Sequence, residues 1–117
     1  MKSENAVRDK SYAFARHCVK LYKYLCEEKK EYILSKQLLR SGTSIGANIA
    51  EGQYGQTKAD FASKLSIAQK EAGETEFWLR LLGDEDYITK TQSESMLADC
   101  RELIRLLQSI TKTLYNK

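Results

Sequence analysis

The stretch FASKLSIAQKEAGETEFWLRLL, residues 61–82, decides the fold class of this chain. Its small and apolar residues recur at alternating steps of four and three, the spacing of a buried stripe on a helix that packs along another helix. These residues are Phe61, Leu65, Ala68, Ala72, Thr75, Leu79 and Leu82. A capping-box pattern from Thr57 to Asp60 precedes the stretch, and Gly83 with the acidic residues 84–86 follows it. The pattern predicts a long amphipathic helix.

Three further segments show helical periodicity. In the first, from about Asn5 to Glu28, apolar residues recur every seven positions. The second follows a charged turn and ends between Gly52 and Gly55, where we expect a glycine in the left-handed conformation as the C-cap. The third begins with a capping-box pattern from Thr91 to Glu94 and continues to the C-terminus.

Length and composition favour a single domain over residues 1–117. The chain has 117 residues with 42% hydrophobic and 30% charged residues, and it has no proline. Such a chain forms one core, and the absence of proline favours few turns and long helices. Four helices joined by short connections pack most readily as antiparallel neighbours. We therefore predict an all-α fold, an antiparallel up-down-up-down four-helix bundle.

The segment from Arg40 to Gly52 is unusual for a helix interior, because glycine there costs about 1 kcal/mol relative to alanine. Gly42, Gly46 and Ala50 follow one another at steps of four and form a smooth face that a neighbouring backbone can approach closely. Asn48 falls on the predicted core stripe, where its amide needs partners. The glycines lack the spacing and the Lys-Ser/Thr of a phosphate-binding loop.

This segment and the helix after it carry a family resemblance. The residues concerned are Arg40, Ser41, Ser44, Ile45, Asn48, Ile49, Ala50, Glu51 and Gly52, followed by Asp60, Phe61, Lys64, Leu65, Ile67, Ala68, Lys70, Glu71, Glu74, Trp78 and Leu79. In these the chain resembles the four-helix-bundle proteins encoded in 23S rRNA intervening sequences. Related to that family is the accessory protein of diversity-generating retroelements, a homopentamer that works with a reverse transcriptase and nucleic acid. The resemblance implies a ring-shaped oligomer, a homopentamer, that associates with nucleic acid, and it implies no known enzymatic activity.

The net charge is +3, from 19 Lys and Arg against 16 Asp and Glu, and the excess of positive charge lies toward the two ends of the chain. This excess forms two basic stripes. If the first and last helices are neighbours, the two stripes together form one positively charged surface for the phosphates of RNA or DNA. The stripes are Arg16, Lys20 and Lys23 on the first helix, and Arg101, Arg105 and Lys112 on the last. The alternative is that these are ordinary solvated helix faces. Five tyrosines (12, 22, 24, 32 and 54) are candidates for stacking on unpaired bases or, alternatively, for bundle edges and subunit contacts.

Two further groups of residues are candidates for structural roles. Phe77 lies on the outward side of its helix beside Gly73, which fits a subunit interface or a lone exposed apolar residue. In an antiparallel hairpin centred near residues 55 and 56, Arg40 lies opposite Glu71, with Glu74 one turn further. We expect an ion pair between Arg40 and one of these carboxylates, partly shielded by Trp78. A polar stripe on the facing helix includes Ser44 and Asn48, and Asn48 is expected to hydrogen-bond in the same interface.

The sequence offers little for catalysis. His17 is the only histidine, no Glu-x-x-His pair is present, and Ser109-x-x-Lys112 lacks its companion motifs. We read the three cysteines as free thiols, and we expect no metal, no cofactor and no enzymatic activity. The polar opening residues and the lack of a long apolar run predict a cytoplasmic protein without membrane contact. A protein-binding scaffold without nucleic-acid contact is the alternative function.

Overall fold

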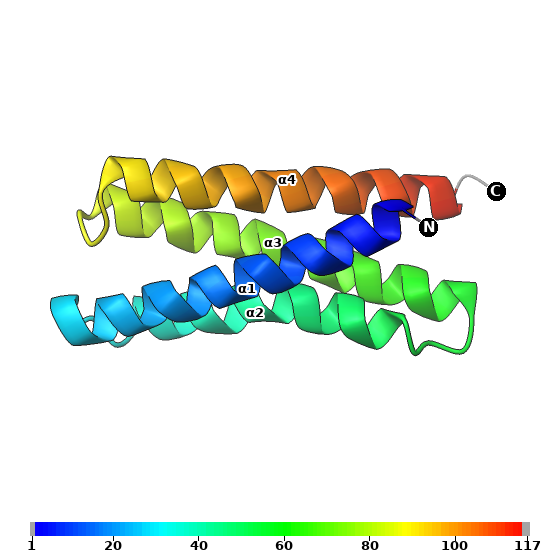
Figure 1. The fold of residues 1–117 in the computed structure, drawn as a ribbon, viewed down its shortest axis with the longest axis horizontal. Helices are drawn as coiled ribbons and strands as arrows, with labels where there is room; N and C mark the ends of the chain where they lie inside the picture. Colours follow the sequence, from blue (N-terminus) through cyan, green and yellow to red (C-terminus); the bar gives the residue numbers. More distant parts are fainter. Residues whose placement is uncertain (1, 116–117) are drawn as a thin grey trace.

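The computed structural model describes residues 2–115, which form four helices and three short connections. The helices are α1 (Lys2–Lys29), α2 (Leu34–Gly52), α3 (Lys58–Asp84) and α4 (Lys90–Tyr115). They alternate in direction along a body of 47 × 21 × 19 Å, with both chain ends at the same end of the bundle (Figure 1). The predicted all-α antiparallel bundle is confirmed, although the final two residues of the predicted last helix lie outside the described residues.

The helices pack in chain order, α1 on α2, α2 on α3 and α3 on α4, whereas the contact between α1 and α4 is the smallest of the four contacts between helices. Figure 1 shows the N-terminal end of α1 beside α4 and the two helices diverging toward the other end of the bundle, where α1 lies with α2. A groove of about 450 Å³ lies between the diverging helices, with Leu21, Ile88 and Met96 among its lining residues.

The buried stripe of α3 follows the predicted heptad closely. Leu65, Ala68, Ala72, Leu79 and Leu82 have no exposed surface. Phe61 is only partly buried, because Ala62 takes the buried place in the first turn of the helix. The core also contains Thr75, whose hydroxyl oxygen lies 2.8 Å from Ser41 Oγ and 2.8 Å from the carbonyl oxygen of Glu71. This polar core residue is therefore satisfied by its neighbours.

Two of the three small residues on α2 allow a close approach of α1, as predicted. A Cβ atom at Gly42 would lie 2.4 Å from Cys18 Sγ, and one at Gly46 would lie 3.3 Å from the carbonyl oxygen of Ser11. A side chain at Gly42 would have to displace the Cys18 side chain or α1 itself, which explains a glycine in this helix interior. Ala50 is exposed and takes no part in the contact.

The ends of two helices differ from the predictions. No glycine in the described chain has a positive φ, so the predicted left-handed C-cap of α2 is wrong; Gln53 caps the helix with φ −69°. The capping box of α4 lies two residues before the predicted one, because Thr89 and Gln92 exchange hydrogen bonds of 2.8 and 3.1 Å. For α3 the prediction is confirmed, since Thr57 Oγ1 accepts from Asp60 N at 3.0 Å.

Candidate nucleic-acid interface

The basic stripe of α1 lies on the outside of the bundle. Arg16, Lys20 and Lys23 are all exposed, on the side of α1 opposite its buried residues. Within residues 2–115, none of the three forms an ion pair. Their charges therefore remain available to an anion from solution.

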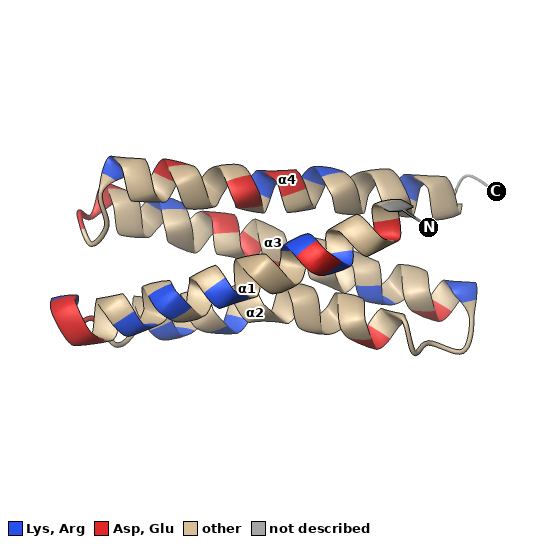
Figure 2. Ribbon diagram, viewed as in Figure 1, with Lys and Arg blue, Asp and Glu red and all other residues tan. Residues whose placement is uncertain are grey.

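The parts of α1 and α2 that carry and adjoin this stripe contain no acidic residue over long runs, although Glu27 follows Lys23 by one turn and Asp99 of α4 lines the same groove as Lys20. From Ser11 to Cys26 in α1, and from Tyr32 to Ala50 at and within α2, the sequence has no Asp or Glu. Because α1 and α2 pack side by side, the outward sides of these two segments form one surface, called here the α1–α2 face. Figure 2 shows the middle of both helices with basic positions only, whereas α3 and α4 carry both signs. The sequence signal is the lack of any acidic residue over these two long runs. A net charge summed over each segment of the chain does not reveal it.

Glu31, which lies between the two segments, has its carboxylate turned to the backbone. Glu31 is 9% exposed, and its two oxygens accept from the backbone N–H groups of Ile33, Leu34 and Ser35 at 3.1, 3.0 and 2.7 Å. Burial alone would raise the pKa of Glu31, but these hydrogen bonds outweigh it and lower the pKa. Glu31 thus caps α2, a role that sequence reasoning missed because the carboxylate precedes the helix by three residues.

The basic stripe of α4 lies apart from that of α1. Arg101 Nε donates to Glu76 Oε2 of α3 at 2.6 Å, so its charge is largely balanced, while Arg105 and Lys112 are exposed. The side of α4 that meets α1 carries acidic residues: Glu102 Oε2 lies 3.1 Å from Lys10 Nζ, and Asp99 Oδ2 lies 4.0 Å from His17 Nδ1. The expectation that the two stripes form one field is therefore wrong, because acidic side chains line the contact between α1 and α4.

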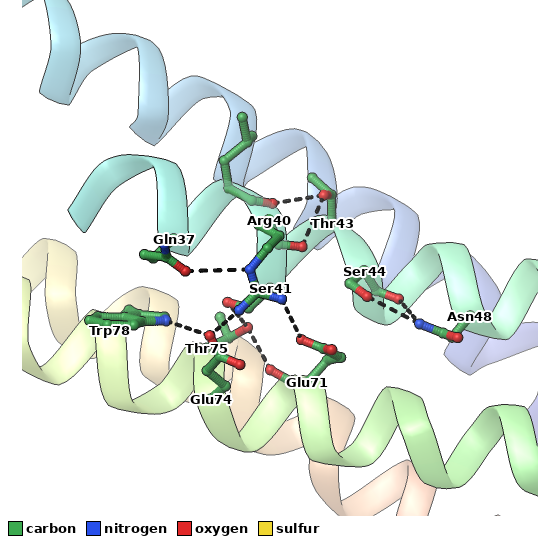
Figure 3. A network of polar contacts seen from close by, with 11 residues as sticks. Gln37, Arg40, Ser41, Thr43, Ser44, Asn48, Glu71, Glu74, Thr75 and Trp78 are labelled. Atoms are coloured by element: carbon green, nitrogen blue, oxygen red, sulfur yellow. Dashed lines mark hydrogen bonds and ion pairs between the residues drawn. The ribbon is translucent and has the colours of Figure 1, made fainter. Parts of the chain in front are cut away.

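Arg40 joins α2 to α3, as predicted (Figure 3). Its Nη1 lies 3.4 Å from Glu71 Oε1, and its Nη2 forms an ion pair with Glu74 Oε2. The indole Nε1 of Trp78 donates to the same Glu74 oxygen at 2.9 Å. The Trp78 hydrogen bond first, and then the Arg40 guanidinium, lower the pKa of Glu74. The predicted ion pair is present and uses both carboxylates.

The surroundings of this ion pair differ from the prediction in two respects. The Arg40 side chain is 50% exposed, so Trp78 shields the ion pair less than expected. Asn48 does not reach α3 with its amide: Nδ2 donates to the carbonyl oxygen and to Oγ of Ser44, at 2.9 and 3.1 Å, one turn earlier in α2 (Figure 3). A partner at i−4 is always within reach of a helical asparagine, whereas a partner on α3 depends on the helix separation.

The outward side of α3 exposes Phe77 and Gly73. Phe77 is 56% exposed, and its ring meets that of Trp78 edge-on at 5.0 Å between centroids. At Gly73, a Cβ atom would find no other heavy atom within 4 Å. The Phe77 ring is therefore open to solvent, on a side of α3 that also exposes Lys70 and Arg80, and nothing in the described chain covers the ring fully.

Other candidate groups have ordinary surroundings. Burial raises the pKa values of Cys18 and Cys100 to about 12, so both thiols stay protonated at neutral pH, and all three cysteines are free. Among the described residues, no three His, Cys, Asp or Glu side chains gather as a metal site requires. No helix of the described chain is long and apolar enough to cross a membrane. Of the five tyrosines considered above, Tyr12, Tyr32 and Tyr54 are exposed.

Comparison with known proteins gives both a family and a structural neighbour. The model of the family "23S rRNA-intervening sequence protein" matches residues 3–109. The crystal structure of a protein of unknown function from the S23 ribosomal protein family of Bacteroides thetaiotaomicron VPI-5482 is similar, with a TM-score of 0.92. The two sequences are 55% identical, and the match covers 94% of this chain and 98% of that chain. The comparison with curated proteins found no match.

Proposed function

The chain belongs to the 23S rRNA-intervening sequence protein family, and on this basis we propose that it is a non-enzymatic accessory protein that binds RNA or DNA. One observation carries the proposal: Arg16, Lys20 and Lys23 are exposed and unpaired within the described chain, and residues 11–26 and 32–50, which form the α1–α2 face, contain no Asp or Glu. Lysine and arginine side chains that neutralise phosphates release counterions, which supplies affinity without sequence preference.

The α4 stripe is the second, separate contact of this proposal. Arg105 and Lys112 are exposed, and Arg101 has Glu76 as its partner, so this stripe offers fewer free charges than α1. We expect charge reversal of Arg101 and Arg105 to glutamate to weaken binding less than changes on α1.

Self-association is part of the proposal. The exposed side of α3 with Gly73 and Phe77 is the proposed contact between copies, because burying an open apolar surface is favourable. The family resemblance points to a pentameric ring, which would repeat the α1–α2 face around its axis and multiply its phosphate contacts. Free thiols fit the reducing cytoplasm, which we propose as the compartment.

The test compares two variants that each remove three positive charges. The first is Arg16→Gln, Lys20→Gln and Lys23→Gln on α1; the control is Lys58→Gln, Lys70→Gln and Lys90→Gln on α3 and α4, all exposed. We expect the α1 variant to bind RNA or DNA at least about tenfold more weakly at low salt, and the control to bind nearly as the wild type does. Equal affinities of the two variants would contradict the role of the α1–α2 face.

The second candidate function is a protein-binding scaffold, and the groove between α1 and α4 favours it. Leu21, Ile88 and Met96 supply apolar lining, and the groove volume is about 450 Å³. A helix or loop of a partner protein would find apolar contacts there. The scaffold function would replace nucleic-acid binding if two results were found together. The wild-type protein would bind none of the nucleic-acid probes, and Met96→Glu would abolish binding of a partner protein.

A further inference from the structure

We propose that the nucleic acid bound by the α1–α2 face is single-stranded, and that its unpaired bases stack on Tyr12 and Tyr32. This inference rests on the proposed function and narrows its ligand from any phosphate polymer to one class. It also assigns roles to two tyrosines that the phosphate contacts alone leave unexplained.

The outer side of α1 carries one aromatic ring, one apolar side chain and two cations along one line. Tyr12, Arg16, Val19 and Lys23 follow one another at steps of four, three and four, which places them in a single row on a helix. At 1.5 Å per residue the row is about 16 Å long. All four residues are exposed, Tyr12 at 69%. A strand laid along this row would meet an aromatic ring, a cation, an apolar side chain and a second cation in turn.

The second ring, that of Tyr32, extends into solvent from a fixed backbone just before α2. Tyr32 is 57% exposed, and it lies between Glu31 and the three backbone N–H groups that Glu31 caps. The capping fixes the backbone on both sides of Tyr32, so its ring is attached to a rigid base although its side chain is in solvent. A ring on a fixed backbone loses less conformational freedom on stacking with a base than a ring on a mobile segment does.

The combination of rings and cations favours unpaired strands over duplexes. A duplex keeps its bases stacked inside and presents mainly phosphates, so exposed tyrosines add little to its binding. A single strand offers the π-face of each base as well as its phosphates, and a stacked base contributes affinity whatever its identity. The lack of carboxylates on the α1–α2 face lets the backbone of the strand lie close to the rings.

Single-residue variants and two RNA probes test this. The probes are an oligouridine of about 16 nucleotides and a hairpin duplex with the same number of phosphates. We expect Tyr12→Ala and Tyr32→Ala each to weaken oligouridine binding about tenfold, with no change in the slope of log affinity against log salt. Tyr12→Phe keeps the ring and should bind as the wild type does. The matched control is Tyr54→Ala, because Tyr54 is 88% exposed but lies in the connection between α2 and α3.

The other possible results distinguish a failure of the stacking inference from a failure of the proposed function. If Tyr12→Ala and Tyr32→Ala match Tyr54→Ala, or weaken the duplex as much as the single strand, the stacking inference is wrong and the proposed function stands. If either alanine variant changes the oligomer mass in light scattering at unchanged helicity, its tyrosine is a contact between copies and the inference is overturned. If the wild-type protein binds neither probe, the proposed function and the inference fall together.

Discussion

Arg40 of α2 and Glu74 of α3 form an ion pair across the bundle, and the indole N–H of Trp78 donates to the same Glu74 oxygen. The Glu74 carboxylate therefore links side chains of both helices, and Glu71, one turn earlier in α3, also lies 3.4 Å from the Arg40 guanidinium. The arrangement makes Arg40 a structural residue whose charge is balanced, in contrast to the free cations of α1.

The first prediction follows from the half-exposed position of Arg40. We expect Arg40→Ala to lower the free energy of unfolding by about 1 kcal/mol, near the upper end for exposed ion pairs, since the side chain is 50% exposed. Urea unfolding followed by the fluorescence of Trp78, the only tryptophan, measures this. Nucleic-acid affinity should stay unchanged. A loss of affinity as large as that of the α1 variant would make Arg40 a phosphate ligand.

The second prediction contrasts two glycines in helix interiors. Gly42→Ala should destabilise the protein by about 1 kcal/mol or more, because a Cβ atom there would lie 2.4 Å from Cys18 Sγ and overpacking outweighs the better helix propensity of alanine. Gly73→Ala meets no such contact and should stabilise the protein by up to about 1 kcal/mol. Thermal unfolding of both variants checks this.

A double variant supplies the control for Gly42. Adding Cys18→Ala removes the sulfur atom that the new methyl group meets, so part of the lost stability should return. If Gly42→Ala is as stable as Gly73→Ala, the close approach of α1 to α2 at this level is contradicted.

The third prediction concerns Glu31 and pH. Its pKa is lower in the folded protein than in the unfolded chain, where it is about 4.3, so its stabilisation is complete at neutral pH and disappears as pH falls through the folded value. Glu31→Gln has one acceptor oxygen in place of two and should be about 1 kcal/mol less stable at pH 7. The difference from the wild type should shrink as pH falls below about 4.3, the pKa of the carboxyl in the unfolded chain. A difference that does not change with pH would contradict the capping role of the carboxylate.

The residue spacing of the sequence was sufficient to predict the fold and one contact between helices. The heptad of α3 predicts its buried residues because helical spacing is a local property. Arg40 was placed opposite Glu71, with Glu74 one turn further, because residues equidistant from a hairpin turn share a level. Both predictions use only distances along the chain.

What the sequence did not reveal depends on how helices are placed relative to one another. The divergence of α1 from α4 decides that Asp99 and Glu102, rather than the basic stripe of α4, lie beside α1. The amide of Asn48 chooses Ser44 in its own helix, and the Glu31 carboxylate turns to N–H groups that follow it in the chain. Such choices depend on separations of an ångström or less, which residue spacing does not give.

The fourth prediction concerns self-association. Light scattering coupled to size exclusion should give a mass several times 13.4 kDa for the wild type. Phe77→Asp should lower the mass, because a carboxylate would be buried in the proposed contact. The control is Tyr54→Asp, because Tyr54 is 88% exposed and lies away from the proposed contact; this variant should leave the mass unchanged. A wild-type monomer at micromolar concentration would rule out the oligomer.

The most direct test of nucleic-acid binding by the α1–α2 face is a salt titration of the wild-type protein with the single-stranded probe. Three cations that each neutralise a phosphate predict a slope of log affinity against log salt of about −2, since a single strand contributes about −0.7 for each phosphate. We expect that slope or a steeper one. A slope of zero, or no binding at about 50 mM salt, would contradict the account.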